Sequence, residues 1–447
     1  GVAGRVSYSY DGRYYIEGNF GYNGSENFAK GHRFGFFPSI AVGYNISNEK
    51  FWQPIKPVIS NLKIRGSWGL VGNDATNAGR FAYMEDLVLG GSDSYTTGIR
   101  QDTYYSGPSW NRYFNPDLTW EVGEKINLGL DLQLFNDFNL TFDIFREKRR
   151  DIFMTRENSI PEIVGTGETK ITSNNGEMEN KGLDLAIDYN KQITKDFFLS
   201  FKSTLTFARN KVLKMDEPPY FEYQGLSDVG HRLGTYWGYV ADGLFPDQET
   251  IDNSPRQDLG YTPQPGDIKY VNQPNAKGEY DNVINSNDRV AIGHPYDPEL
   301  VYGFGPSMKW KNWDFSFFFQ GVARTSFMMY GMHPFGTTSI KNMLQFVADD
   351  HWSVDNPNPN AAYPRLTKDS NGNNDQYSTY WLRNAAFLKL KNAEIGYTYK
   401  GMRFYLSGVN LLTFSPFKHW DPEMGGGNGL YYPTQRVFNI GFQMTIQ

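Results

Sequence analysis

The chain has 447 residues, a formal net charge of −6 and no cysteine. The lack of cysteine excludes a disulfide scaffold, thiol catalysis and a cysteine-bound metal, and the mild negative charge argues against nucleic acid as the main partner. Hydrophobic residues make up 39% of the chain, aromatic residues reach 16%, and glycine occurs 46 times. Since no run of about 18 apolar residues is present, a transmembrane helix is also excluded. This composition favours an all-β protein.

Alternation of apolar and polar residues with a period of two predicts thirteen β-strands, eleven of them clean. In segment 381–399 the apolar set changes parity, from Leu388 and Leu390 to Ala393 and Ile395, and such a change predicts a β-bulge. The predicted strands cover approximately residues 2–11, 13–23, 34–47, 61–72, 126–134, 138–144, 182–190, 197–208, 299–310, 313–320, 381–399, 402–413 and 438–446.

The connections between these strands alternate between short and long. Most of the long ones exceed what a compact domain normally contains, so one end of the predicted sheet is tight and the other is elaborated. The short turns lie near residues 11–13, 48–60, 136–137, 194–196, 311–312 and 400–401, and the long connections near 24–33, 73–118, 155–173, 214–298, 329–380 and 414–432.

Aromatic residues flank the short turns, as Tyr10 and Tyr14, Trp310 and Trp313, or Tyr399 and Phe404 illustrate. Aligned across antiparallel strands, they predict a belt of rings at one level. Such belts are typical of the membrane–water boundary of transmembrane barrels. The alternative is that these rings form the core of a soluble β-sandwich.

The charged residues of the regular strands decide between these two interpretations. A charge on the lipid face of a barrel costs about 2–4 kcal/mol at the midplane, and the apolar stripes contain no Asp, Glu or Lys. Because thirteen strands enclose too much volume for side chains to fill, the polar face is expected to line a lumen. The opposite, polar faces carry Arg65, Asp131, Asp143, Asp184, Asp188, Lys202 and Asp314.

An odd number of strands does not close a bacterial barrel, so further strands are expected on another piece of the protein. If the last strand ends on the periplasmic side, the long loops are extracellular and residue 1 lies at the external end. The expected location is the outer membrane.

Several stretches resemble the C-terminal half of SusC-like TonB-dependent transporters, which are outer-membrane nutrient importers of Bacteroidota. The resemblance covers essentially the whole chain, residues 1–447. It is carried by Arg33–Asn45 (RFGFFPSIAVGYN), Leu62–Asn73 (LKIRGSWGLVGN), Asn115–Leu130 (NPDLTWEVGEKINLGL), Met178–Asp184 (MENKGLD), Gly238–Leu244 (GYVADGL), Pro265–Tyr270 (PGDIKY), Asp288–His294 (DRVAIGH), Ser378–Tyr397 (STYWLRNAAFLKLKNAEIGY) and Arg436–Gln447.

The resemblance implies a 22-stranded barrel closed by an N-terminal plug, of which this chain supplies about the last thirteen strands. The plug, the TonB box and the early strands are expected on the remaining N-terminal fragment, through which TonB acts. A SusD-like surface lipoprotein is the expected lid, and a dimer of transporter–lipoprotein pairs is a further expectation. Outer-membrane lipid and lipopolysaccharide are expected around the barrel, and nucleic acid is not a partner.

Members of this family often carry an acidic calcium-type loop after the GDIKY stretch, whereas residues 272–278 here have little acidic density. Four residues of the 214–298 connection remain candidate calcium ligands, Asp267, Asp281, Asn285 and Asp288, because hard cations prefer several oxygen ligands. The alternative is an ordinary Asx-rich turn. No other cofactor is expected.

The long loops are rich in aromatic residues, whose rings stack on sugars and whose polar groups bind glycan or peptide. They are candidates for substrate or partner contact, and the alternative is that they pack the loops together. The candidate contact residues are Trp110, Tyr113, Tyr236, Trp237, Trp352, Tyr380, Trp381 and Trp420.

Two further segments have predicted features. Residues 339–352 have apolar spacing compatible with a short loop helix. Arg146, Lys148, Arg149 and Arg150 form a basic cluster that would attract lipopolysaccharide phosphates, or else belong to a solvated strand end.

The resemblance to SusC-like transporters implies active, TonB-dependent import of an oligosaccharide or oligopeptide through the outer membrane, together with a SusD-like lid. A passive porin or adhesin barrel without energy coupling is the alternative. The six histidines form no H-E-x-x-H pair, and no G-x-S-x-G elbow is present, so an enzyme is not predicted.

Overall fold

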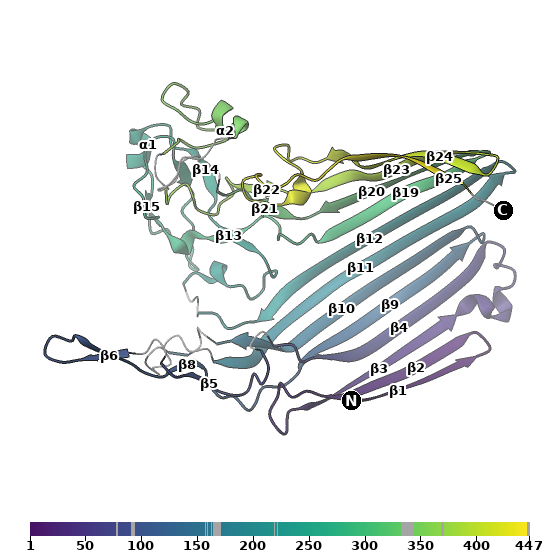
Figure 1. The fold of residues 1–447 in the computed structure, drawn as a ribbon, viewed down its shortest axis with the longest axis horizontal. Helices are drawn as coiled ribbons and strands as arrows, with labels where there is room; N and C mark the ends of the chain where they lie inside the picture. The colour runs from purple at the N-terminus through teal and green to yellow at the C-terminus, as the bar shows by residue number, and fades with distance from the viewer. Residues whose placement is uncertain are drawn as a thin grey trace. The chain divides into compact units, whose positions relative to one another are not determined.

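The computed structural model describes residues 1–447 except 77–78, 91–93, 157, 159, 162, 164–170, 219, 221, 332–343, 368–370 and 445–447. Thirteen strands form one sheet in chain order, without a crossover, as Figure 1 shows. They are β1 (Val2–Tyr10), β2 (Tyr14–Gly24), β3 (Phe34–Asn45), β4 (Ile59–Asn73), β9 (Glu121–Leu134), β10 (Phe138–Thr155), β11 (Thr172–Thr194), β12 (Phe197–Lys214), β19 (Leu300–Trp310), β20 (Trp313–Ala323), β23 (Phe387–Tyr399), β24 (Met402–Phe414) and β25 (Val437–Met444).

The remaining elements are short and belong to the connections. Paired strands are β5 (Asp86–Val88) with β8 (Ser109–Arg112), β6 (Ser94–Thr97) with β7 (Thr103–Ser106), β13 (Tyr236–Gly238) with β18 (Val290–Ile292), β14 (Ala241–Leu244) with β16 (Ile268–Tyr270), β15 (Arg256–Gln257) with β17 (Val283–Ile284), and β21 (Ser326–Met328) with β22 (Leu382–Asn384). The helices are α1 (Gln248–Asp252), α2 (Gln345–Asp349) and the 3₁₀ turns η1 (Ile46–Asn48), η2 (Lys50–Trp52), η4 (Gln224–Leu226), η5 (Ser286–Asp288) and η6 (Pro422–Met424).

The chain divides into two compact units. The first comprises residues 1–184, 208–219 and 228–231, and the second comprises residues 185–207, 220–227 and 232–447. Within the described residues, no helix is long and apolar enough to cross a membrane.

The thirteen predicted strands are the thirteen strands of the sheet, and the pairing follows the alternation in the sequence. Leu128 of β9 faces Ile144 of β10, and Leu130 faces Phe142, so apolar residues meet on one face. On the other face, Asp131 lies opposite Thr141. The prediction of an all-β chain with a large antiparallel sheet is confirmed.

The apolar side chains of the sheet are exposed rather than packed into a core. Leu128 is 56% exposed and Phe442 55% exposed, and neither Phe315 nor Phe317 is buried. The buried hydrophobic residues gather in the connections instead, in one cluster around Phe28 and Trp120 and in a larger one within residues 239–417. A sheet with one exposed apolar face and one polar face does not fit the soluble β-sandwich.

The aromatic residues beside the short turns lie in register across the strands. In the second unit, Phe197 pairs with Trp310, Trp310 with Trp313, Trp313 with Tyr397, Tyr397 with Phe404, and Phe404 with Phe442. These six residues form an unbroken row, here called the aromatic row. In the first unit, Tyr14 stacks on Tyr44 with ring centroids 5.0 Å apart.

The β-bulge predicted in the 381–399 segment is present in β23. Against β20 the register shifts between Leu390 and Asn392, which leaves Lys391 as the extra residue of β23. Against β24 the register shifts at the same point, where Asn410 and Leu411 of β24 lie opposite Lys391 alone. The turn that follows β23 is a two-residue hairpin turn, in which Lys400 and Gly401 have φ values of 47° and 78°. Two residues with positive φ match the right-handed twist of the strands that they join.

The loop helix predicted over residues 339–352 is observed only in part. Helix α2 covers Gln345–Asp349, and residues 339–343 lie outside the described part of the chain. Val347 faces inward from this helix and is fully buried. The burial of Val347 therefore accounts for part of the apolar spacing that predicts this loop helix.

Candidate functional site

The polar face of the sheet in the first unit carries an ion-pair network. Arg65 of β4 donates to Asp143 of β10 over 2.7 Å and to Asp131 of β9 over 3.3 Å. Gly129 of β9 lies between Arg65 and Asp143 in the register. A Cβ atom at Gly129 would be 2.5 Å from the Arg65 Cζ, so the absent side chain makes room for the guanidinium.

The second unit repeats this arrangement with other residues. Arg403 of β24 donates from Nε to Asp314 of β20 over 3.0 Å, and its Nη2 reaches both Asp314 and Glu394. Gly396 of β23 lies between the two, and a Cβ atom there would be 2.5 Å from the Asp314 carboxylate. In both units an arginine thus spans a glycine to reach a carboxylate two strands away, on the face predicted to be polar.

A hollow of about 460 Å³ lies on the second unit's sheet. Small residues such as Gly305 and Ser407 create the space, and Lys202 and Glu394 give it both charges. The lining residues are Ser200, Lys202, Gly305, Ser307, Ser316, Phe317, Phe318, Asn392, Ala393, Glu394, Ser407, Gly408 and Val409.

The long connections of the second unit fold around a buried polar network centred on Asp267. The side chain of Asp267 is fully buried and accepts hydrogen bonds from Arg365 over 2.7 Å and from Asn371 and Asn374 over 2.9 Å each. Gln257 joins the same core, because it donates to the Ile268 carbonyl and accepts from the Tyr270 amide. A network in which each buried group has partners holds a loop region in one conformation.

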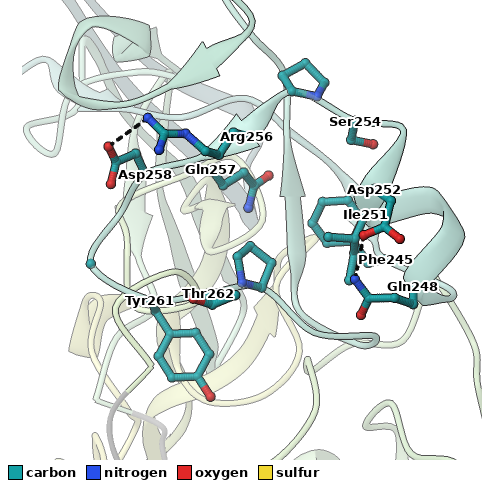
Figure 2. A pocket seen from close by; sticks show the side chains of 13 residues that line it. Phe245, Gln248, Ile251, Asp252, Ser254, Arg256, Gln257, Asp258, Tyr261 and Thr262 are labelled. Carbon is teal, nitrogen blue, oxygen red and sulfur yellow. Dashed lines mark hydrogen bonds and ion pairs between the residues drawn. The ribbon is translucent and has the colours of Figure 1, made fainter.

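This network supports one wall of an open pocket of about 790 Å³. Arg365 donates from Nη2 to the Tyr261 hydroxyl over 2.8 Å, which holds that ring at the pocket. Figure 2 shows Tyr261 and the Arg256–Asp258 ion pair at the left of the pocket, and Phe245, Ile251 and Gln248 at the right. Asp247 caps α1 by accepting from the Thr250 amide.

The pocket combines rings and apolar side chains with both donors and acceptors. This composition suits sugar rings and peptide groups, which present apolar faces beside polar edges. The lining residues are Phe245, Gln248, Ile251, Asp252, Ser254, Pro255, Arg256, Gln257, Asp258, Gly260, Tyr261, Thr262 and Pro263.

The four predicted metal ligands each have a hydrogen-bond partner within the protein. The carboxylate of Asp267 is occupied by Arg365, while Asp288 accepts from the amides of Gln273 and Asn285 in a capping box. Burial raises the pKa of Asp288 even though these amides oppose the shift. Asp281 accepts from the Val283 amide. Within the described residues no group of three His, Asp or Glu side chains is placed to hold a metal, so calcium binding stays a prediction.

The predicted contact residues fall into two groups. Trp352 and Trp381 are each 7% exposed and belong to the loop core, where Trp381 donates to the Asn374 carbonyl over 2.7 Å. Their packing corresponds to the structural alternative for the loop aromatics. The partly exposed ones are Trp110, which stacks on Tyr113 in the first unit, and Tyr236, Trp237, Tyr380 and Trp420 in the second.

Tyr236 and Tyr380 are neutral hydrogen-bonding groups at ordinary pH. Burial, reinforced by the nearby Tyr296 and Tyr377, raises the pKa of Tyr236 to about 12. Burial likewise raises the pKa of Tyr380, whose hydroxyl donates to the Ala361 carbonyl over 2.8 Å. The role of both groups of aromatic residues in contacting a ligand stays a prediction.

Three of the four residues in the basic cluster of β10 are paired with acidic residues. Arg146 contacts Glu179 over 2.6 Å and Lys148 contacts Glu177 over 3.0 Å. Arg149 bridges Glu121 and Glu147. Because these charges are largely neutralised within the strands, contact with lipopolysaccharide phosphates also stays a prediction.

Sequence reasoning missed Arg365, Tyr261 and the asparagine-rich run Asn371–Asn374. Asp267 and Arg365 are separated by 98 positions, and no periodicity connects two loop residues at such a distance. The run of three asparagines within four residues was the available signal, because buried amides satisfy both donors and acceptors.

Comparison with known proteins gives consistent matches. The family model described as "TonB dependent receptor-like, beta-barrel" matches residues 1–411. The TonB-dependent receptor SusC of Bacteroides thetaiotaomicron is 29% identical over 99% of this chain and 43% of its own length, and the TonB-dependent receptor P3 of Formosa agariphila is 27% identical over 99% and 45%. The chain therefore spans less than half the length of these relatives.

The same fold occurs in a solved structure. The RagAB peptide importer in its closed-closed state superposes with a TM-score of 0.74 and 22% identity, covering 99% of this chain and 47% of that one. With residues 1–411 matched by the family model, the chain belongs to the TonB-dependent receptor-like β-barrel family.

Proposed function

We propose that this chain forms part of the wall of an outer-membrane importer, which takes up a nutrient with energy relayed by TonB. The observation that carries the proposal is the division of the sheet into an exposed apolar face, bordered by the aromatic row, and a face with charge networks. A transmembrane barrel with lipid outside and a polar path inside requires this division of its sheet into two faces. Family membership supports the coupling to TonB.

The proposed importer has the parts that the family resemblance implies. A plug and a TonB box belong to the remainder of the protein, the long connections face the cell exterior, and the C-terminal end of β25 faces the periplasm. A SusD-like lipoprotein covers the loops, and two such pairs associate. The match to SusC and the fold shared with RagAB support the lipoprotein partner.

The proposed substrate is an oligosaccharide or an oligopeptide. The open pocket beside Tyr261 supports this class, since it offers a fixed ring together with donors and acceptors. The name of the RagAB structure describes a peptide importer, which adds weight to the oligopeptide. We propose no catalytic role for the chain.

Uptake measurements test the proposal against a passive porin. Cells that carry or lack the complete protein would be given labelled oligosaccharides and oligopeptides, in strains with and without TonB. We expect saturable uptake of one substrate class that is lost with either the protein or TonB. Uptake that persists without TonB would establish the passive barrel instead.

A further inference from the structure

Arg383, at the centre of β22, is a half-buried arginine without a carboxylate partner. Its Nη1 donates to the carbonyls of Tyr380 over 2.6 Å and Leu382 over 3.1 Å, and no carboxylate of the described residues lies within ion-pair distance. The half-buried arginines elsewhere in this unit differ, because Arg365 is paired with Asp267 and Arg403 with Asp314. A guanidinium withdrawn from water without a counter-charge is unfavourable.

The remaining nitrogens of Arg383 are open to a ligand. Its Nε and Nη2 have no hydrogen-bond partner in the described part of the chain, and neither atom is among the unpartnered atoms sealed from solvent. These two N–H groups lie on one edge of the guanidinium and match the two oxygens of a carboxylate. The two backbone carbonyls fix Nη1 and so orient this edge before a ligand arrives.

Two ring-bearing residues, Tyr380 and His419, interact electrostatically with Arg383. Tyr380 is held by its hydrogen bond to Ala361 and by an edge contact with Trp381, with ring centroids 4.8 Å apart. His419 lies close enough for Arg383 to act on it electrostatically, and its ring stacks on Phe346 at 3.9 Å. Burial, followed by the Arg383 charge, lowers the pKa of His419, so the imidazole is an uncharged hydrogen-bonding group at pH 7.

We propose that Arg383 forms a carboxylate-binding site for the imported substrate, with its Nε–Nη2 edge binding both oxygens. This inference rests on the proposed function and narrows its substrate to carboxylate-bearing molecules. Two sources supply the group: the terminal or acidic carboxylate of an oligopeptide, and the uronic acid of an oligosaccharide. A neutral glycan leaves the guanidinium without its counter-charge.

Binding to the complete transporter, purified in detergent, tests the proposal by calorimetry with two matched pairs of probes. One pair is tetra-alanine with a free or an amidated C-terminus, and the other is trigalacturonate with neutral maltotriose. We expect at least one pair to show a preference of about tenfold or more for the carboxylate, which corresponds to about 1.4 kcal/mol. The probe pair that shows the preference identifies whether the carboxylate comes from an oligopeptide or from an oligosaccharide.

Three variants assign that preference to Arg383. Arg383→Gln should abolish it, and Arg383→Lys should reduce it several-fold, since an ammonium keeps the charge but loses the two-pronged edge. Arg289→Gln is the matched control, because Arg289 is an exposed arginine of the same unit that donates only to a backbone carbonyl. The control should keep the full preference.

The proposal is overturned if neither pair shows a preference, or if Arg383→Gln retains it. Should Arg383→Gln not fold, as judged by its thermal unfolding, Arg383→Lys decides, and an unchanged preference in that variant contradicts the site. Because binding in detergent needs no TonB, a loss of the import activity alone would refute the proposed function and leave this site standing.

Discussion

At the scale of single residues, a glycine on the polar face of each unit leaves space for an ion-pair network. Arg65 reaches Asp143 across Gly129, and Arg403 reaches Asp314 across Gly396, on separate sets of strands. Neither glycine has a positive φ, so neither is required by the backbone conformation. The requirement is space for a guanidinium.

Replacing Gly129 by alanine should therefore destabilise the barrel. The new Cβ would lie 2.5 Å from the Arg65 Cζ and 2.7 Å from an Asp143 oxygen, and overpacking of this kind typically costs about 1–3 kcal/mol. Thermal unfolding followed by tryptophan fluorescence measures the change. Gly18→Ala is the control, because nothing lies within 4 Å of that Cβ position; equal effects of the two substitutions would refute the explanation.

At the same scale, a group of ion pairs attaches the last long connection to the sheet. Lys389 is fully buried and contacts Asp421 over 2.7 Å and Glu423 over 2.6 Å, and Lys391 also reaches Glu423. Burial acts to raise the pKa of both carboxyl groups, but the hydrogen bonds from Lys389 and its neighbours outweigh burial and lower the pKa of each.

This attachment should weaken in acid. A carboxyl group with a lowered pKa in the folded state contributes stability that is present above its ordinary pKa and is lost as the pH falls through the lowered value. We expect proteolysis within residues 415–436 to accelerate below about pH 4. Lys389→Met should give rapid cleavage already at pH 7, whereas the exposed Lys418→Met should not. Cleavage that is independent of pH and of Lys389 would contradict the attachment.

At the scale of single elements, the bulge in β23 restores the alternation of the strand after Lys391. In a regular strand, Lys389 and Lys391 already share the polar face. Without a bulge, however, Ile395 would also lie on that polar face, and Glu394 would lie on the apolar face. The extra residue corrects this, so that Glu394 returns to the polar side and Ile395 to the apolar side. Bulges commonly re-aim side chains in this way.

Deleting Lys391 should consequently be tolerated by the sheet. The shortened strand alternates without interruption, with Leu388, Leu390, Ala393 and Ile395 on the apolar face, while the contact of Lys391 with Glu423 is lost. We expect near-normal amounts of the protein in outer-membrane fractions. Deletion of Phe317, in a part of β20 that pairs regularly with β23, should abolish assembly, because half of the strand then turns its polar residues to lipid. Assembly of the second variant would show that parity does not govern insertion.

The strands could be predicted from the sequence because their structure depends on neighbours two positions apart. Alternation located all thirteen strands, and the parity change located the bulge. The connections could not be predicted in the same way, since their core joins distant residues such as Asp267 and Arg365. Asp267 illustrates this limit, because its pairing with Arg365 could not be predicted beside its predicted role as a metal ligand.

At the scale of the whole molecule, the account depends on which face of the sheet meets lipid. The buried hydrophobic clusters lie in the connections, while the apolar residues of the strands remain exposed. In water such a surface would favour aggregation, and in a bilayer it becomes the required exterior. Transport, the lipoprotein lid and the carboxylate site all assume this orientation.

The most direct test places a spin label at two adjacent positions of β9 in the complete protein, reconstituted in a bilayer. The chain has no cysteine, so Leu128→Cys and Asn127→Cys each provide a single labelling position within it. The account predicts that the label at position 128 collides with oxygen dissolved in the lipid, and that the label at position 127 does not. Equal shielding of both labels from oxygen, as in the core of a soluble sandwich, would contradict it.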